Sequence, residues 1–380
     1  MKKPIIYADH AATTALSPRA WEAMRPFLTD DYTNPSTLYQ FSRASRKAVA
    51  AARARIADCI GASPEEIYFT SCGTEADNWA LKGTAFKQRG RIVTSAIEHH
   101  AILRACDFLR RMGFEVSYLP ADSRGIVAPD ALEGVIQREP ACLVSVMMAN
   151  NEIGTLEPVR RLADVAHRYG ALFHTDAVQA VGHIPVNVRE LGADMLSASA
   201  HKFNGPKGVG FLYVRDGIAL EPLLHGGGQE SGLRAGTENV AGIVGMAAAL
   251  SEHMETLQED RQQLERLRAL LLSRLQDSGI RFLVNGAEER IPGSLSLSFY
   301  QAEGEMLLHR LDLMGIAVAT GSACNSKETV LSHVIRAIGI PESYARGTIR
   351  ITLGTDNDEE QVSEIARALV KVLGGQDAPI

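Results

Sequence analysis

The sequence has few of the features that mark secreted or membrane proteins. It contains five cysteines among 380 residues, an odd number, and no two of them form a C-x-x-C pair. This pattern argues against a disulfide framework and against a zinc ribbon, so we expect a reducing, cytoplasmic setting. The longest apolar stretch, Val240–Leu250, is too short to cross a bilayer, and the first ten residues lack the apolar core of a signal peptide.

Clusters of basic residues are also absent. The net charge is −6 at pH 7, so we expect no direct binding to nucleic acid or to an anionic membrane surface. The composition, 46% hydrophobic and 22% charged, is that of an ordinary globular protein. A length of 380 residues predicts two or three domains with enough apolar side chains for a large core.

Strand-like and helical segments alternate between residues 67 and 214, which predicts an α/β fold. Each strand-like run is short and apolar, and helical stretches separate the runs. We therefore expect a mainly parallel sheet with helices on both faces. The predicted strands are Ile67–Thr70, Arg91–Ser95, Phe114–Leu119, Cys142–Met147, Ala171–Thr175, Asp194–Ser199 and Gly208–Val214. The predicted helices lie near Thr74–Gln88, His100–Met112, Pro129–Arg138 and Pro158–Tyr169.

The rest of the chain predicts a second, smaller domain. The large domain would span residues 16–255, and the small domain residues 1–15 and 256–380. Leucines at spacings of three, four or seven predict a long helix over Val240–Leu275 that joins the two. We expect an extended arm at 1–15, helices at Pro18–Leu28, Ser36–Ile60, Gly304–Leu313, Val330–Ile338 and Asp358–Leu373, and strands at Ser294–Phe299, Ile316–Ala319 and Thr348–Leu353.

Two charged residues follow two successive predicted strands. Asp176 comes directly after Ala171–Thr175, and Lys202 comes shortly after Asp194–Ser199. In an open α/β sheet, ligands bind at the carboxyl ends of the strands, so we expect both side chains beside one ligand. Pyridoxal phosphate needs a lysine for its aldehyde and an acid for its ring nitrogen. A surface lysine and a helix-capping aspartate are the ordinary alternatives.

Other segments predict further parts of the same site. Gly73 and Thr74 open a helix after a strand, where backbone N–H groups favour a phosphate, although a plain helix cap has the same pattern. Cys324 lies among small residues, which would let a thiolate reach a bound substrate. Arg350, on a predicted strand, either grips a carboxylate with two hydrogen bonds or faces solvent.

Two apparent motifs are rejected. Gly226–Gly232 looks like a dinucleotide-binding loop, but Ser231 replaces the last glycine and no clear strand–helix unit surrounds it, so a nicotinamide dehydrogenase is not supported. Glu98, His99 and His100 are adjacent, so their side chains point in different directions, and no partner has a ligand spacing. We predict no metal site, and a stacking or proton-transfer role for one histidine.

Together, these motifs closely resemble the cysteine desulfurases of the NifS/IscS type, which are fold-type I pyridoxal phosphate enzymes of the class V aminotransferase group. The match runs from Tyr7 to about Gly354, nearly the whole chain. It implies a large domain with a mainly parallel sheet of the seven-stranded type, and a smaller α/β domain that carries the cysteine loop. The most specific segments are Tyr7–Thr14, Ala149–Gly154, His174–Gln179, Ser199–Gly208, Arg234–Asn239 and Gly321–Cys324.

The resemblance implies a role for each matching residue. Lys202 would bind the cofactor covalently, Asp176 would hold its ring nitrogen, and Gln179 its phenolic oxygen. His99 would stack on the ring and shuttle a proton. The phosphate would be held by Gly73, Thr74, Ser199 and His201, with Thr237 from the other subunit of an obligatory homodimer. The substrate carboxylate and the cofactor edge would be held by Asn34, Asn151 and Arg350.

The implied reaction converts L-cysteine to L-alanine. The Cys324 thiolate attacks the substrate sulfur, keeps it as a persulfide and passes it to an acceptor protein or a small thiol; on a scaffold, Cys324 could also ligate a cluster iron transiently. We expect no extended tail of the kind that this family uses for scaffold docking, so iron–sulfur cluster assembly, tRNA thiolation, and DNA or cofactor sulfuration all stay open. Cys72, where many members have glycine, is either a second reactive thiol or an inert small residue.

Two other functions stay open. A selenocysteine lyase of the same fold would depend less on the thiol of Cys324. A non-catalytic binding protein with this fold would be colourless when purified, and the intact Lys202, Asp176 and Cys324 speak against it.

Overall fold

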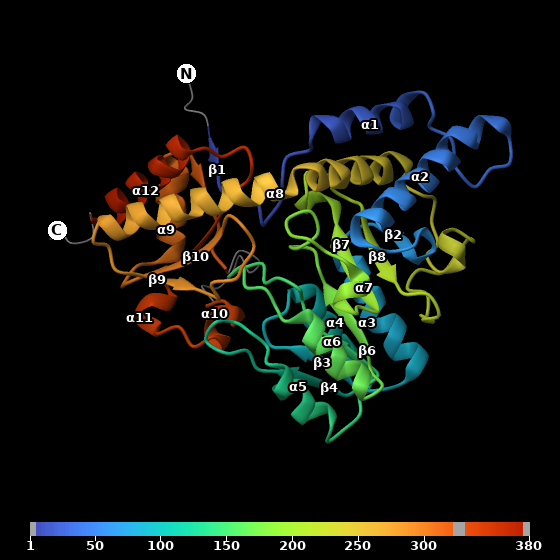
Figure 1. The fold of residues 1–380 in the computed structure, drawn as a ribbon, viewed down its shortest axis with the longest axis horizontal. Coiled ribbons are helices and arrows are strands. Elements are labelled where there is room, and N and C mark those ends of the chain that lie inside the picture. Colours follow the sequence, from blue (N-terminus) through green and yellow to red (C-terminus); the bar gives the residue numbers. More distant parts are fainter. Residues whose placement is uncertain (1–4, 322–330, 375–380) are drawn as a thin grey trace.

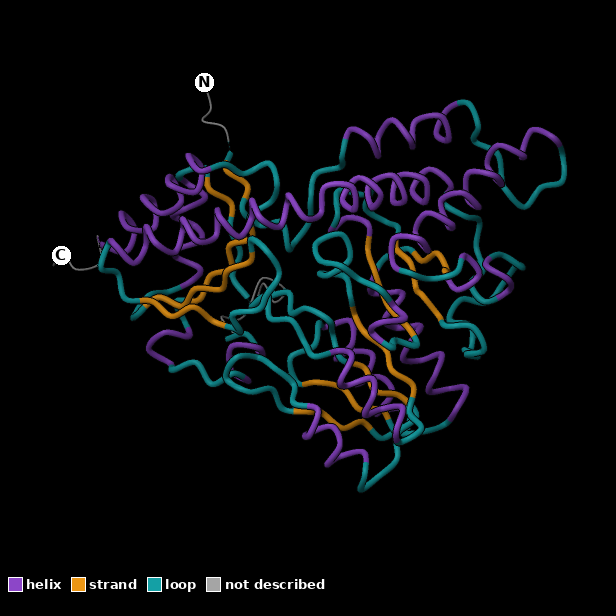
Figure 2. The backbone as a smooth tube through the Cα atoms, viewed as in Figure 1, coloured by secondary structure: helices purple, strands orange, loops and turns teal. Residues whose placement is uncertain are grey.

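The chain forms two main sheets in separate parts of the molecule, and one long helix runs along both (Figures 1 and 2). This computed structural model describes residues 5–321 and 331–374. The larger part holds the helices α1 (Pro18–Thr29), α2 (Arg43–Ile60), α3 (Gly73–Gln88), α4 (His100–Arg111), α5 (Pro129–Ile136), α6 (Val159–Arg168) and α7 (Val188–Leu191). The smaller part holds α9 (Gly304–Leu313), α10 (His333–Ala337), α11 (Glu342–Ala345) and α12 (Glu359–Gly374).

The larger sheet has seven strands in the order β2-β8-β7-β6-β5-β3-β4. Neighbouring strands are parallel except at β8, which is antiparallel to both β2 and β7. The predicted α/β fold with a large, mainly parallel sheet is therefore confirmed. The strands are β2 (Ile67–Thr70), β3 (Ile92–Ser95), β4 (Val116–Leu119), β5 (Leu143–Ser145), β6 (Leu172–Asp176), β7 (Met195–Ser199) and β8 (Gly210–Val214).

Both faces of this sheet are covered, which explains why its central strands are apolar without alternation. Successive residues of one strand point to opposite faces. Ile92 packs in one hydrophobic cluster with Trp79 of α3, and its neighbour Val93 packs in another with Leu162 of α6. The same division holds along β5 and β7. With both faces occupied by helices, the carboxyl edge of the strands is the place left for a ligand.

The smaller part is built on an antiparallel sheet in the order β12-β10-β9. Its strands are β9 (Phe282–Asn285), β10 (Ser294–Phe299) and β12 (Thr348–Thr352), and a parallel pair joins β1 (Ile6–Tyr7) to β11 (Ile316–Ala317). The N-terminal arm thus packs with the smaller part (Figure 1). The core of this part is a hydrophobic cluster of its own, which supports the domain division predicted at residue 255. That division stays a prediction.

Helix α8 (Val240–Asp277) changes its surroundings along its length. From Val240 to Leu250 it is buried almost all round and packs in the core of the larger part. From Leu264 onward, a stripe of leucines belongs to the core of the smaller part. The predicted joining helix is therefore confirmed. Neither α8 nor any other helix of the described ranges has the length and apolarity needed to cross a membrane.

The predicted start of the second helix is wrong. The prediction begins at Ser36, whereas α2 begins at Arg43. The hydroxyl of Ser42 donates to the carbonyl oxygens of Thr37 and Tyr39 and stabilises a tighter turn ahead of the helix. Side chains that bond their own backbone in this way compete with the regular helical ladder.

Several short elements also differ from the prediction. The helix predicted over Val330–Ile338 begins at His333, because the Ser332 hydroxyl accepts the first amides of α10 and caps it. The prediction contains no β9, α7 or α11. Each of these elements has four residues, too few for a periodic pattern to appear in the sequence.

Candidate functional site

A cavity of about 340 Å³ lies at the edge of the larger sheet where the parallel strands end. The N-terminal arm, residues 319–321 and β12 contribute its other wall. Most residues that the sequence predicts for the site line this cavity. They are Gly73, Thr74, His99, Asn151, Asp176, Gln179, Ser199, His201, Lys202 and Arg350.

Asp176 is the last residue of β6 and is nearly buried. One carboxylate oxygen accepts a hydrogen bond from the amide of Val178 at 2.9 Å, which fixes the side chain. Burial raises the pKa of Asp176, whereas nearby His99 and Lys202 lower it. A buried carboxyl group at a strand end, aimed at a cavity, suits a ring nitrogen that needs a negative partner.

Lys202 ends the 3-10 turn that follows β7, the strand next to β6. Its Nζ donates to the carbonyl oxygens of Ala11 at 2.5 Å and Ala12 at 2.8 Å. Gln179 Nε2 donates to the same Ala11 oxygen at 3.0 Å. The N-terminal arm therefore gathers two of the predicted cofactor-binding side chains at one point of the cavity.

His99 caps the start of α4 with its own side chain. Its Nδ1 accepts a hydrogen bond from the amide of Ala101 at 3.1 Å, so a neutral ring carries its proton on Nε2. Burial lowers the pKa of His99; Lys202 and His100 lower it too, and Asp176 opposes them. The ring is therefore neutral near pH 7, and its orientation is set before any ligand binds.

The start of α3 has the shape and polarity of a phosphate site. A Cβ atom on Gly73 would lie 2.5 Å from Cγ2 of Val178, so glycine alone fits without a shift of its neighbours. The hydroxyl of Ser199 is buried and has no hydrogen-bond partner within the described residues. A phosphate could accept from that hydroxyl and from the amides at the helix start. Thr74 and His201 line the same corner, so the residues present fit the cofactor's phosphate.

Arg350 reaches the cavity from β12. Its Nη2 donates to Asp9 Oδ1 at 2.6 Å, and its Nη1 donates to the carbonyl oxygen of Asn151 at 2.9 Å. Its Nε is buried and makes no hydrogen bond to any described residue. The guanidinium is thus fixed by two partners at the cavity wall and retains a donor, which suits the recognition of a carboxylate.

No local sequence pattern predicts a role for the N-terminal arm, yet Asp9, Ala11 and Ala12 line the cavity. The segment Tyr7–Thr14 is one of those that carry the family resemblance, and this resemblance is the sequence feature that could have indicated a place for the arm in the site. An extended arm gives no local indication of the site that it covers, because β1 pairs with β11 near the other end of the chain.

Asp77 is a second buried carboxyl group, and no sequence pattern predicts its place in the site. A carboxyl oxygen of Asp77, a carboxyl oxygen of Asp176 and a ring nitrogen of His99 all lie within 4.8 Å of one another. Asp77 Oδ1 has no hydrogen-bond partner in the described parts of the chain, and burial, with Asp176 beside it, raises the pKa of Asp77 well above its usual range. His174, 3.8 Å away, stays neutral because burial lowers its pKa to about 3. Two carboxyl groups in such surroundings retain one proton between them.

Two predicted site residues lie away from the cavity of this chain, and a third is outside the described residues. Asn34 is in the connection between α1 and α2, where its side chain accepts the amide of Ser36 at 2.9 Å, and it does not line the cavity. Thr237 is exposed in the loop before α8 and also lies away from the cavity of its own chain. Cys324 lies outside the described residues. The roles of all three stay predictions.

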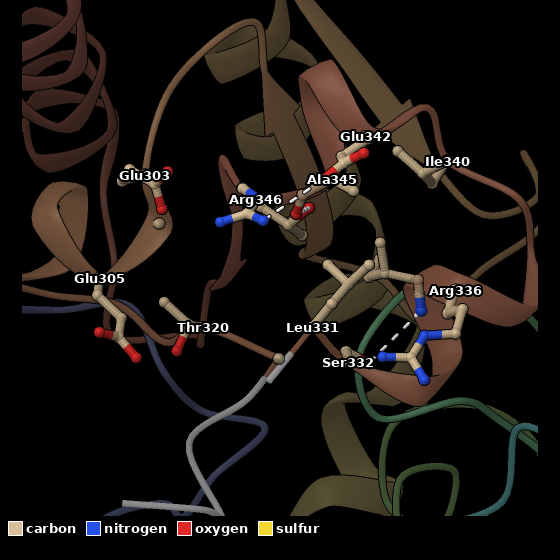
Figure 3. A pocket seen from close by; sticks show the side chains of 14 residues that line it. Glu303, Glu305, Thr320, Leu331, Ser332, Arg336, Ile340, Glu342, Ala345 and Arg346 are labelled. Carbon is tan, nitrogen blue, oxygen red and sulfur yellow. Dashed lines mark hydrogen bonds and ion pairs between the residues drawn. The ribbon is translucent and has the colours of Figure 1, made fainter. Parts of the chain in front are cut away.

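Figure 3 shows a second cavity, of about 550 Å³. Thr320 and Gly321 line both cavities. Charged side chains of both signs surround the second one, including Glu305 of α9 and Arg336 of α10 (Figure 3). The two cavities therefore share a wall that is formed by the residues just before the predicted cysteine loop.

Comparison with known proteins identifies the family. A model of the aminotransferase class-V family matches residues 6–365. The chain is 47% identical over 372 residues to a Dictyoglomus turgidum protein named cysteine desulfurase IscS, and the match covers 97% of this chain and 94% of that one. This chain belongs to the class-V aminotransferases.

Solved structures agree with membership in the class-V aminotransferases. One described as a NifS-like protein has a TM-score of 0.91 and 40% identity, and covers 98% of this chain and 100% of its own. Another, described as SspA in complex with cysteine, has a TM-score of 0.82 and 35% identity, and covers 92% of this chain and 99% of its own. The fold is that of the fold-type I pyridoxal phosphate enzymes, and pyridoxal phosphate is the cofactor.

Proposed function

We propose that this protein is a pyridoxal phosphate-dependent cysteine desulfurase, which converts L-cysteine to L-alanine and delivers the sulfur to an acceptor. The observation that carries the proposal is the single cavity in which Lys202, Asp176 and Ser199 lie at neighbouring strand ends, opposite Arg350. Extensive identity to proteins named cysteine desulfurase supports the choice of substrate.

When bound, pyridoxal phosphate supplies an electron sink for the carbon atom that loses its proton. Lys202 would hold its aldehyde, Asp176 its ring nitrogen and Gln179 its phenolic oxygen. The cradle of Gly73, Thr74, Ser199 and His201 would hold its phosphate. Within the described residues, the Ser199 hydroxyl has no hydrogen-bond partner. This indicates that the cradle is built to hold a group that accepts hydrogen bonds.

The protein's own side chains then orient the substrate and move its protons. Arg350, fixed by Asp9 and Asn151, would bind the substrate carboxylate. The Lys202 amine would take the proton from the substrate Cα. His99 has its Nδ1 engaged by a backbone amide, so Nε2 is the ring atom that would exchange a proton during the reaction.

Cys324 is the proposed nucleophile. Its thiolate attacks the substrate sulfur, the C–S bond breaks, an S–S bond forms, and the electron pair of the broken bond passes to carbon. Protonation of that carbon completes L-alanine. The sum is L-cysteine plus the Cys324 thiol giving L-alanine plus the Cys324 persulfide, so no external oxidant or reductant is needed until the sulfur leaves.

A homodimer is part of this proposal. The loop that carries the exposed Thr237 is braced by two ion pairs, Glu230 with Arg53 at 2.7 Å and Arg234 with Glu75 at 2.8 Å. A braced, exposed threonine suits a contact with the phosphate of a second protomer. Large apolar side chains that a partner subunit would cover are exposed on α1 and the connection to α2: Trp21, Leu28, Tyr32, Leu38, Tyr39 and Phe41.

The sulfur acceptor is a protein or a small thiol. Relatives named IscS favour a scaffold for iron–sulfur clusters among the pathways left open by the sequence, and on such a scaffold Cys324 would contact the cluster iron. The odd number of cysteines supports a reducing, cytoplasmic setting.

The test measures alanine and sulfide released from L-cysteine in the presence of a reductant. The native protein should release both in equal amounts, and Cys324→Ala almost none. Cys59→Ala is the matched control, because burial raises the pKa of that thiol to about 11 and it lies on α2, outside the cavity. Equal activity of native protein and Cys324→Ala would overturn the nucleophile and favour a selenocysteine lyase; a colourless, inactive protein would favour a binding protein.

A further inference from the structure

Glu152 is a buried acid at the wall shared by the two cavities, and the proposed reaction gives it no role. Only 6% of the residue is exposed, and it lines the cofactor cavity. Its backbone is fixed, because Asn150 Oδ1 accepts the amides of Glu152 at 2.9 Å and Ile153 at 3.1 Å. Asn150 Nδ2 in turn donates to the carbonyl oxygen of Ile97 at 2.9 Å. The Glu152 carboxyl group therefore projects from a rigid turn of the larger part.

The first contact of this carboxyl group is with Ser332. The Ser332 hydroxyl donates to Glu152 Oε2 at 2.5 Å and accepts the amide of Val334 at 3.1 Å as the cap of α10. One hydroxyl thus connects the carboxyl group of the larger part to the start of a helix in the smaller part. Glu152 is 180 positions away from Ser332 in the chain.

The second contact is with Gly321. A Cβ atom on Gly321 would clash with Glu152 Oε2 and lie 3.1 Å from Cβ of Ser332. A side chain at position 321 would therefore displace the Glu152 carboxyl group, which approaches Gly321 closely. Gly321 and Leu331 are the described residues nearest to Cys324 on its two sides, and Ser332 directly follows Leu331.

Neighbouring contacts also hold the start of α10 against the larger part. Ile97 and Ile153 of the larger part pack with Val334 and Ile335 of α10 in one hydrophobic cluster. His333 Nε2 lies 3.0 Å from the carbonyl oxygen of Glu98. The start of α10 is thus attached to the larger part, close to the turn that carries Glu152.

We infer that Glu152 is a positioning residue of the sulfur-transfer step, which fixes Gly321 and Ser332 relative to each other and to the cofactor cavity. The inference rests on the proposed function, since it assigns the effect to the Cys324 thiol. Binding of the cofactor and of L-cysteine uses other groups, so Glu152 should affect the transfer of sulfur to Cys324 and leave the earlier steps unchanged.

The test compares Glu152→Ala with Glu157→Ala in protein loaded with cofactor. Glu157 is a matched control, because it is a buried acid in the same connection between β5 and α6 and its carboxyl group accepts a hydrogen bond from the amide of Val127 at 2.8 Å. It lines neither cavity. Glu152→Ala should lower kcat and the single-turnover rate of persulfide formation on Cys324 at least tenfold. The KM for L-cysteine and the change in cofactor absorbance on adding L-cysteine should stay within twofold. Glu157→Ala should behave as the native protein in all of these measurements.

Two substitutions of Ser332 separate positioning from a general loss of structure. Ser332→Gly still allows α10 to begin at the same place, because glycine is tolerated as a helix cap, but it cannot donate to Glu152, so it should reproduce the defect of Glu152→Ala. Ser332→Thr keeps both the cap and the donor, so it should restore the native rate. The double variant with Glu152→Ala and Ser332→Gly should lose no more than either single variant, because both remove one shared contact.

Several outcomes overturn the inference. A native rate of persulfide formation in Glu152→Ala, or an equal loss in Glu157→Ala and Ser332→Thr, would show that Glu152 does not position these residues. An altered cofactor absorbance in Glu152→Ala would assign Glu152 to cofactor binding instead. A native protein that forms no persulfide on Cys324 would refute the proposed function itself, which is a separate result.

Discussion

The two walls of the cofactor cavity are built in different ways. The sheet-side wall takes Asp176 and Lys202 from the ends of β6 and β7, and Gly73 from the start of α3, all within one sheet and its covering helix. The opposite wall takes Asp9 from the N-terminal arm and Arg350 from β12, and Glu152 contacts it from a turn of the larger part; the three residues have partners 180 to 341 positions away in the chain. The backbone positions of the first wall are fixed within one sheet, although Lys202 also donates to Ala11 and Ala12 of the arm, whereas the second wall is assembled by long-range contacts alone.

The two walls also hold groups with different proposed roles in the reaction. The sheet-side wall holds the groups proposed to bind the cofactor and move protons, where a rigid parallel sheet fixes their geometry. The opposite wall holds the groups proposed to bind the substrate carboxylate and to position Gly321 and Ser332. Because long-range contacts can break one at a time, we expect substitutions in the opposite wall to impair single steps, and substitutions in the sheet-side wall to abolish the reaction.

The largest effect is expected for Lys202→Ala in the sheet-side wall. Without the amine, both the covalent attachment of the cofactor and the proton transfer at Cα are lost, so alanine release should fall roughly 10³-fold or more. Lys207→Ala is the matched control, since Lys207 is exposed a few residues further along the same loop. Alanine release and cofactor absorbance should be recorded for both; native turnover in Lys202→Ala would refute its role.

In the opposite wall, Asp9→Asn should change binding more than chemistry. Asp9 fixes Arg350 through a hydrogen bond of 2.6 Å between charged groups, and such bonds contribute about 1.5–3 kcal/mol. The KM for L-cysteine should therefore rise roughly 10- to 100-fold, while kcat stays within a few fold. Asp356→Asn, a change at an exposed acid of the smaller part, should leave KM unchanged. A larger fall in kcat than rise in KM for Asp9→Asn would remove the distinction between the walls.

The same contrast explains which parts of the site the sequence predicts. Asp176 and Lys202 follow two apolar strands of one sheet, so a local pattern and the rule for parallel sheets place both at one edge. The α/β class and the joining helix follow from similar periodic signals. These predictions succeed because the relevant contacts repeat within a few residues of the chain.

The opposite wall carries no such signal. Asp9 lies in an arm whose partner strand, β11, is near the other end of the sequence. Glu152 lies in a turn that is held by hydrogen bonds from backbone amides to the Asn150 side chain. Asp77 lies within α3, where an aspartate on a helix ordinarily faces solvent. Its burial beside Asp176 results from the packing of α3 on the sheet, which no spacing within α3 reveals.

A smaller effect, on stability, is expected for Glu98, which is fully buried next to His99 of the sheet-side wall. Glu98 accepts from Ser95 at 2.6 Å and Met147 at 3.0 Å, and burial raises its pKa to about 8. Between about pH 4.5 and 8 the folded state holds a proton that the unfolded state releases, so this group lowers stability as pH rises, by up to about 1.4 kcal/mol per pH unit.

Glu98→Gln should therefore flatten the dependence of the free energy of unfolding on pH. Urea denaturation at pH 5.5 and pH 7.5 measures it for the native protein, for Glu98→Gln and for the exposed control Glu115→Gln. The native protein and the control should lose stability in parallel over this range, and Glu98→Gln should lose less. Parallel behaviour of all three proteins would mean that Glu98 is ionised in the folded state.

The smallest effect is expected for Asp77→Asn, and it tests the sheet-side wall most directly. Asp77 and Asp176 lie close together in buried surroundings, and burial raises the pKa of Asp77 well above its usual range, so Asp77 is the member of the pair that keeps the proton. Asparagine has the shape of the protonated acid. The variant should therefore keep the native cofactor affinity, and its cofactor absorbance should change with pH as in the native protein, with kcat within about threefold.

Asp176→Asn provides the contrast at the same point of the cavity. It removes the charge that the ring nitrogen requires, so it should weaken the cofactor's electron sink and lower kcat by roughly 10²-fold or more. If Asp77→Asn instead produced the larger loss of kcat and the larger change in cofactor absorbance, Asp77 would be the ionised partner of the cofactor's ring nitrogen. The two carboxyl groups would then exchange roles, although both would still lie on the wall that local structure fixes.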